Sequence, residues 1–258
     1  MLDKSYANTA VAVADIRSGA SIAVGGFGLS GNPTELINAL LDAGIGDLSI
    51  VSNNCGTDGK GLGVLLAARR ISRITASYVG ENKEFERQYL RGELEVELTP
   101  QGTLAEKLRA GGSGIPAFFT RTGVGTLVAD GGLPQKYADD GSVLKASEAK
   151  EVRTIDFAGE RQQYVLEHSI VTDYALVHAA LGDTHGNLVF NKAARQFSVP
   201  AAMAGRICIA QVEELVPAGE LDPAQVHLPG VFVHRIVEVG KQHPKPIERR
   251  TTRGSQQQ

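Results

Sequence analysis

The chain has 258 residues, of which 42% are apolar and 21% are charged, a balance typical of a globular protein that buries a sizeable core. Its formal net charge of −3 gives no electrostatic reason to expect nucleic acid or an anionic membrane as a partner. No stretch approaches the roughly 20 apolar residues that cross a bilayer, and the first residues lack the pattern of a signal peptide. We therefore expect a cytoplasmic protein with no nucleic-acid partner and no membrane association.

Short apolar runs alternate with amphipathic segments from the start of the chain. Residues 21–24 predict a buried strand, residues 32–44 a helix and residues 48–51 a second strand. Asn32 is expected to cap this helix and Pro33 to occupy its first position. A strand, a helix and a further strand in this order predict a right-handed crossover between parallel strands.

The same rhythm continues through most of the chain. Further helices are expected over residues 62–68, 82–91 and 103–110, and further strands over residues 71–79, 94–98, 174–177, 206–210 and 231–237. Residues 131–165 are polar and glycine-bearing, and they predict a small inserted hairpin near a sheet edge, with strands at 152–157 and 163–166. The fold class is therefore α/β, with an open, mostly parallel, doubly wound sheet in one domain over residues 1–240.

The last 18 residues, 241–258, differ in composition from this domain. They contain five Lys or Arg residues and one Glu, with almost no apolar side chains. A segment with so little to bury is expected to be a disordered basic tail.

A glycine-rich loop follows the first strand. Residues 26–31 match the pattern G-x-G-x-x-G between a strand and a helix, a context in which backbone N–H groups can approach a phosphate. A nicotinamide-dinucleotide site would also need Asp or Glu at the end of the second strand, where residues 52–54 are Ser, Asn and Asn. The residues alone leave three interpretations open: a phosphate-bearing ligand, an NAD(P)-dependent oxidoreductase, and a purely structural turn.

Residues 21–33, SIAVGGFGLSGNP, resemble the first signature of the family I CoA-transferases, an apolar strand followed by Gly-Gly-Phe and then a glycine and a proline at set spacing. Other stretches resemble blocks of the alpha (A) subunits of this family, namely residues 51–54, 78–82, 92–106, 109–118, 186–190, 202–204 and 246–251. The resemblance covers about residues 5–240. It implies the sugar-isomerase-like α/β fold of these subunits. The insertion and the ending favour the 3-oxoacid branch over the related 3-oxoadipate branch.

The resemblance implies one half of an enzyme that moves CoA from succinyl-CoA to a 3-oxoacid such as acetoacetate. Members of this family work by a ping-pong mechanism, in which a glutamate forms an acyl anhydride and then an enzyme–CoA thioester. That glutamate lies in a Glu-Asn-Gly block of the B subunit. Here Glu81 is followed by Asn82 but then by Lys83, so we expect Glu81 to be a solvated or capping carboxylate.

Several expectations about catalysis and partners follow from this resemblance. The chain should hold no catalytic nucleophile and be inactive alone, and it should assemble with a B subunit, as A2B2. No cofactor is expected to be bound permanently, since the CoA thioester is a substrate. A non-catalytic ligand-binding module on the same fold is the remaining alternative.

The resemblance also assigns binding roles. The residues expected to contact CoA are Gly25, Gly26, Phe27, Gly28, Leu29, Ser30 and Gly31. Asn53 and Asn54 are expected to hydrogen-bond the substrate or CoA, and Gln101 to face the acyl carboxylate or carbonyl. The structural alternatives are a turn in which Asn53 and Asn54 satisfy their own backbone, and an N-terminal helix cap at Gln101. The six histidines form no i, i+4 pair, so no metal site is expected.

Overall fold

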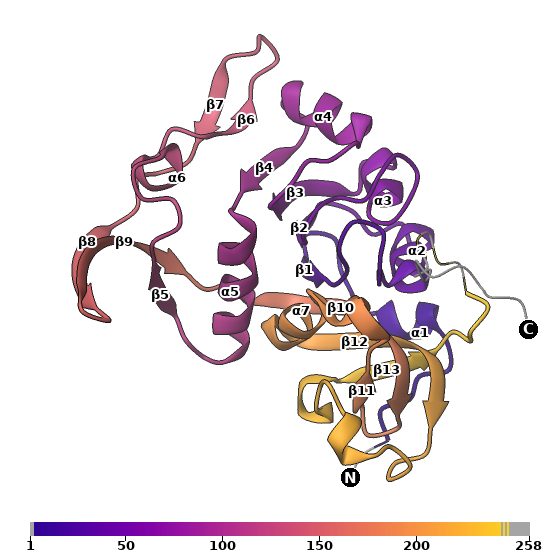
Figure 1. The fold of residues 1–258 in the computed structure, drawn as a ribbon. Coiled ribbons are helices and arrows are strands. Elements are labelled where there is room, and N and C mark those ends of the chain that lie inside the picture. The colour runs from indigo at the N-terminus through magenta and orange to yellow at the C-terminus, as the bar shows by residue number, and fades with distance from the viewer. Residues whose placement is uncertain (1–2, 244, 246, 248–258) are drawn as a thin grey trace, which may run out of the picture.

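The computed structural model describes residues 3–243, 245 and 247. An open sheet lies at its centre, with the strand order β13-β12-β10-β1-β2-β3-β4 (Figure 1). These seven strands pair in parallel, and β11 pairs with β10 in the antiparallel sense. The strands of this sheet are β1 (Ser21–Val24), β2 (Leu48–Val51), β3 (Ile71–Ala76), β4 (Glu95–Leu98), β10 (Thr172–Asp183), β11 (Leu188–Val189), β12 (Gly205–Val216) and β13 (Arg235–Glu238). The predicted fold class is confirmed.

Helices cover both faces of the sheet, as expected for parallel strands joined by helical crossovers. The α-helices of the two layers are α1 (Thr9–Val13), α2 (Thr34–Asp42), α3 (Gly63–Ala67) and α4 (Lys83–Leu90) on one face, and α5 (Gln101–Gly112) and α7 (Ser198–Ala204) on the other. Alternation along β1 shows how the sequence builds both layers. Ile22 and Val24 join the core under α1–α4, whereas Ala23 joins the core under α5 and α7.

Three short 3-10 helices connect the later strands. They are η1 (Lys192–Arg195), η2 (Pro223–Gln225) and η3 (Gly230–Phe232).

The start of α2 differs from the sequence prediction. The helix begins at Thr34 with Pro33 at the cap position, and no side chain caps it. The Asn32 side chain instead donates from Nδ2 to the Gly28 carbonyl, at 3.1 Å. The prediction of an Asn32 cap was wrong because this side chain closes the glycine loop that precedes the helix.

The insertion is larger than the single hairpin predicted over residues 131–165. It comprises β5 (Ala117–Thr120), α6 (Leu127–Asp130), β6 (Pro134–Tyr137), β7 (Val143–Ala146), β8 (Val152–Phe157) and β9 (Glu160–His168). The expected hairpin is β8–β9, but β5 joins it as a third strand and β6–β7 forms a second hairpin. These strands form an arm that reaches outward beyond α5 (Figure 1). The buried Glu167 ties the arm to the domain through Lys107 of α5, at 3.4 Å.

The structure describes only the first part of the segment predicted to be a disordered tail. Lys241 pairs with Glu214, and Lys245 pairs with Glu213 at 2.9 Å. His243 is buried. Lys241 and Lys245 therefore lie against β12, while residues 244, 246 and 248–258 fall outside the described residues.

Candidate functional site

Four successive strands end in a connected group of polar residues at one edge of the sheet. Gly28 follows β1, Asn53 follows β2, Ser77 follows β3, and Gln101 follows β4 at the first position of α5. The carboxyl ends of parallel strands are where ligand sites of open α/β sheets gather. We call these four residues the strand-end network.

Hydrogen bonds join the network and fix its amide groups. The Gly28 backbone N–H donates to Asn53 Oδ1 at 3.1 Å. Because a backbone N–H can only donate, this bond identifies the oxygen of the Asn53 amide. Asn53 Nδ2 must then donate, and it does so to Gln101 Oε1 at 2.7 Å. The oxygen of Gln101 is therefore held inside the network.

The remaining atom of this chain of bonds is Gln101 Nε2. The Gln101 side chain is exposed, and among the described residues no hydrogen bond is made by its Nε2. Two N–H donors are thus available to a ligand at this edge. They fit a carbonyl, a carboxylate or a developing oxyanion, all of which accept hydrogen bonds. The side chain bonds Asn53 and Ser77 and does not cap its own helix.

Asn53 and Asn54 have different surroundings. Asn53 bonds Gly28 and Gln101, so its side chain belongs to the site and not to a local turn. Asn54 Oδ1 accepts from the Gly56 backbone N–H two residues on, at 3.2 Å. The structural alternative therefore applies to the oxygen of Asn54, and its predicted contact with substrate stays a prediction.

The glycine loop has less capacity for a phosphate than its sequence pattern suggests. Phe27 and Ser30 exchange N–H···O bonds, each of 3.0 Å, across a tight turn. Gly25 N–H donates to the Leu176 carbonyl, and Gly28 N–H is taken by Asn53. Four of the seven loop amides are thus bonded within the protein. The role of residues 25–31 in binding CoA stays a prediction, and a phosphate cradle made by all of their N–H groups does not fit.

The loop glycines also differ in what surrounds them. A Cβ on Gly26 would overlap the Asn32 side-chain oxygen, and a Cβ on Gly31 would press on Ala194. A Cβ on Gly28 would meet nothing within 4 Å, although its φ of +61° lies in the left-handed region. Internal packing accounts for Gly26 and Gly31, whereas Gly28 borders open space beside the network.

Glu81 lies outside the network. It is exposed, and the next residue, Asn82, is the N-cap of α4 and accepts from Phe85 N–H at 2.9 Å. The strand-end network itself contains amides, a hydroxyl and a backbone N–H, but no carboxylate.

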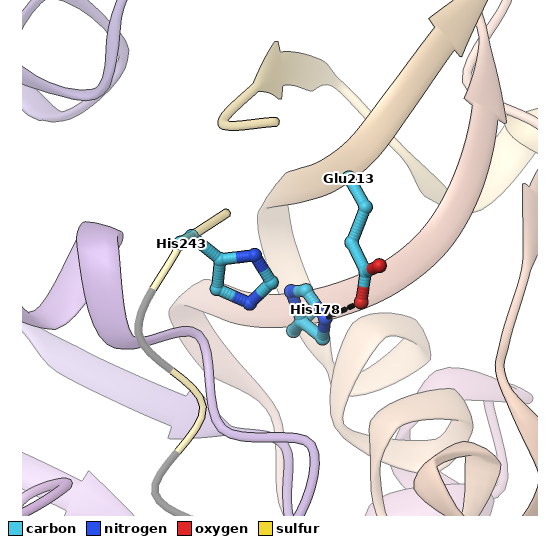
Figure 2. A group of neighbouring side chains, drawn as sticks. All are labelled: His178, Glu213 and His243. Carbon is cyan, nitrogen blue, oxygen red and sulfur yellow. Dashed lines mark hydrogen bonds and ion pairs between the residues drawn. The ribbon is translucent and has the colours of Figure 1, made fainter. Parts of the chain in front are cut away.

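A second polar group lies on the α2 face of the sheet, where His178 of β10, Glu213 of β12 and His243 converge (Figure 2). Their nitrogen and oxygen ligand atoms all lie within 4.8 Å of one another, and two histidines with one carboxylate is a set that binds zinc or iron. Sequence spacing missed this group because its members lie on three separate segments.

The hydrogen bonds around His178 disfavour binding of a metal ion at its Nε2. Gln211 Oε1 accepts from the Leu36 backbone N–H at 3.0 Å, so Gln211 Nε2 faces His178 Nδ1 as a donor, at 3.2 Å. His178 Nε2 then carries the proton and donates to Glu213 at 3.2 Å. A metal on Nε2 would require the proton on Nδ1, where a metal-bound histidine normally meets an acceptor. The absence of a metal site stays a prediction.

Electrostatics agree with a neutral His178. Burial, together with the nearby His243, lowers the pKa of His178 to about 4. Although burial favours the neutral acid, hydrogen bonds from Lys245 and His178, together with the charge of Lys245, hold the pKa of Glu213 below its usual value. His178 and Glu213 therefore form a hydrogen-bonded neutral–anion pair against which His243 packs, with 4.6 Å between the two ring centroids.

Within the described part of the chain, no helix has both the length and the apolar character needed to cross a membrane.

Comparison with known proteins identifies the family of the whole domain. The coenzyme A transferase family model matches residues 6–239. The A subunit of a probable succinyl-CoA:3-ketoacid coenzyme A transferase from Mycobacterium tuberculosis is 62% identical, over 98% of this chain and 100% of that protein. A mouse mitochondrial succinyl-CoA:3-ketoacid coenzyme A transferase 2A is 48% identical, over 97% of this chain but 47% of that protein.

A solved structure supports the same placement at the level of fold. Glutaconate coenzyme A-transferase from Acidaminococcus fermentans superimposes with a TM-score of 0.74 at 21% identity, covering 92% of this chain and 76% of that chain. The family match spans nearly all of the described domain, including the glycine loop and the strand-end network. The chain belongs to the coenzyme A transferase family and is a chain of a CoA-transferase enzyme.

Proposed function

We propose that this chain is the A subunit of a transferase that moves CoA from succinyl-CoA to a 3-oxoacid such as acetoacetate. The observation that carries the proposal is the 62% identity, end to end, with the mycobacterial relative of that name. The strand-end network supports it, because Gln101 offers N–H donors of the kind that a thioester carbonyl or a substrate carboxylate needs.

The proposed reaction is ping-pong and uses a glutamate of the partner. A glutamate oxygen attacks the carbonyl carbon of succinyl-CoA, and the C–S bond breaks to give a mixed anhydride and CoA thiolate. The thiolate attacks the glutamyl carbonyl, which releases succinate and leaves a glutamyl–CoA thioester. Acetoacetate then reverses these steps and leaves as acetoacetyl-CoA, with the glutamate restored.

Each of these steps passes through a tetrahedral oxyanion. A fixed N–H donor directed at that oxygen lowers the barrier, because negative charge develops on it only in the transition state. Gln101 Nε2 is the donor that this chain offers, and the bond from Asn53 holds it in place. The open space at Gly28 is where we place the CoA arm next to it.

Three exposed apolar side chains support a partner at the same edge of the sheet. Phe27, Tyr78 and Leu98 are 44%, 60% and 41% exposed, and they follow or end β1, β3 and β4. The network beside them has no carboxylate to act as the nucleophile. We infer that a B subunit covers this edge and supplies the glutamate, in an A2B2 assembly. The mouse relative, about half of whose length has no counterpart here, fits such a partner.

The test is to co-produce this chain with its proposed B partner and to assay CoA transfer from succinyl-CoA. Acetoacetate is expected to be the better acceptor, and 3-oxoadipate the poorer one. A kcat/KM that favours 3-oxoadipate would overturn the proposed substrate and support the related 3-oxoadipate enzyme. Light scattering of the purified complex tests A2B2.

A further inference from the structure

Ser77 is a member of the strand-end network that no sequence pattern singled out. Its Oγ lies 3.0 Å from Gln101 Oε1, 3.0 Å from the Asn53 carbonyl and 3.2 Å from Asn53 Nδ2. Its backbone N–H also donates to the Asn53 carbonyl, at 3.0 Å. The hydroxyl therefore lies between the side-chain amides of Asn53 and Gln101.

The hydroxyl has one proton and two acceptors within reach. Asn53 Nδ2 donates to Gln101 Oε1 and, more weakly, to Ser77 Oγ. The Ser77 proton can then go to Gln101 Oε1 or to the Asn53 carbonyl. When the proton goes to Gln101 Oε1, the three groups form a closed triangle in which the Gln101 oxygen accepts from both Asn53 Nδ2 and Ser77 Oγ, and this is the arrangement that holds the carboxamide.

Because Gln101 is exposed, these hydrogen bonds are needed to fix the position of its side chain. A glutamine side chain loses rotamer freedom when it is fixed, and this one has little packing to hold it because it is exposed. A single bond from Asn53 would leave the carboxamide able to swing. A second contact at the same oxygen stops that swing and leaves Nε2 directed away from the network.

We propose that Ser77 is a positioning residue for CoA transfer, which acts by holding the Gln101 carboxamide with its nitrogen toward the substrate. This inference rests on the proposed function, since it assigns Gln101 Nε2 to the oxyanion. Ser77 itself touches no reacting atom.

The experiment is a double-mutant cycle in the assembled complex of this chain with its B partner. S77A is expected to lower kcat by about tenfold, the size of one hydrogen bond, with KM for succinyl-CoA changed by less than about twofold. In a Q101A background, S77A should cause no further loss, because Ser77 has nothing left to position. S77T keeps the hydroxyl and should restore most of kcat.

The control is S72A, which removes a serine hydroxyl from β3, the strand that Ser77 follows; within the described part of the chain this hydroxyl bonds only the Leu48 carbonyl. It should leave kcat unchanged. Equal losses from S77A in both backgrounds, or an S77A enzyme with full kcat, would overturn the proposal. If the wild-type complex prefers 3-oxoadipate, the proposed substrate fails, and the same cycle run on 3-oxoadipate still decides the role of Ser77.

Discussion

The Gln101 carboxamide takes its orientation from a backbone group that is distant in sequence. Gly28 N–H fixes the oxygen of Asn53, and Asn53 Nδ2 in turn fixes the oxygen of Gln101. Because the Gly28 N–H can only donate, it determines which side-chain atom of Asn53 is oxygen, and Asn53 in turn determines this for Gln101. The sequence alone could not predict either orientation. Among the described residues, the network therefore leaves the N–H pair of Gln101 Nε2 unbonded at the edge of the sheet.

Replacing Gln101 by glutamate tests this polarity. The new carboxylate could still accept from Asn53 and Ser77, but its second oxygen would place negative charge where Nε2 now donates. We expect Q101A to lose at least about tenfold in kcat/KM, since a hydrogen bond to a charged group contributes about 1.5–3 kcal/mol, and Q101E to lose more than Q101A. A Q101E enzyme more active than Q101A would show that the site needs an acceptor at this position.

Gly26 and Gly28 should respond differently to alanine. G26A forces a Cβ into the Asn32 oxygen, so we expect a lower melting temperature. G28A meets open space at a φ of +61°, which costs about 1–2 kcal/mol, and it should fold yet lose CoA transfer by placing a methyl group in the proposed CoA path. Thermal unfolding and steady-state kinetics measure both effects. A G28A complex with normal KM for succinyl-CoA would remove the loop from the CoA site.

The sequence indicated two members of the strand-end network and missed the bonds that join them. Asn53 and Gln101 were singled out because their blocks resemble those of the family, and their binding roles stay predictions, but their mutual bond spans 48 residues and leaves no local signal. The position of Ser77 at the end of a strand also points to this edge of the sheet. It is the first residue after β3, as Asn53 is the second after β2, so the rule that ligands gather at strand ends would have found it.

At the scale of elements, buried His178 and half-buried Glu213 join β10 and β12 to the C-terminal segment. His243 packs on the His178 ring, and Lys245 bonds Glu213. The groups that face His178 are therefore Glu213, His243, Lys245 and the Gln211 amide. These surroundings stabilise the neutral imidazole of His178 relative to its protonated form.

This arrangement predicts loss of stability on acidification. His178 has a folded-state pKa of about 4 against an ordinary value of 6.5, so between these values the unfolded chain binds a proton that the folded chain does not. The free energy of unfolding should therefore fall as the pH drops from about 6.5 toward 4. The pKa of Glu213 is lowered in the folded chain, so protonation of Glu213 reduces the free energy of unfolding further only at still lower pH.

Urea unfolding at pH 7 and pH 5 measures this effect. The H178Q variant removes the titrating group and should reduce the difference between the two pH values. H185Q, at a half-buried histidine in the turn after β10, is the matched control and should behave as wild type. Equal pH dependence in wild type and H178Q would contradict the assignment of His178 as a neutral buried histidine.

The prediction of elements from sequence succeeded where the pattern is local. The rhythm of strands and helices over the first hundred residues follows from apolar spacing, and the structure reproduces it. Asn32 was misassigned because its bond to the Gly28 carbonyl depends on the folded loop. The arm was underestimated because β5 belongs to it only by pairing with β9, about fifty residues later.

At the scale of the whole molecule, the proposed function makes this chain one half of a catalytic apparatus. It holds donors at the carboxyl edge of a parallel sheet and exposes Phe27, Tyr78 and Leu98 beside them. Transfer between two carboxylic acids also needs a carboxylate nucleophile shielded from water, and the strand-end network has none. The central claim is therefore that the covalent intermediate forms on the partner.

Borohydride reduction of the thioester tests this claim most directly. This chain and its B partner are mixed with succinyl-CoA, treated with borohydride, and analysed by mass spectrometry for the chain in which a glutamate has become the corresponding alcohol. We expect the modification on a glutamate of the B partner, with this chain unmodified and inactive when assayed alone. Modification of Glu81 or of another carboxylate in this chain, or turnover by this chain without its partner, would contradict the account.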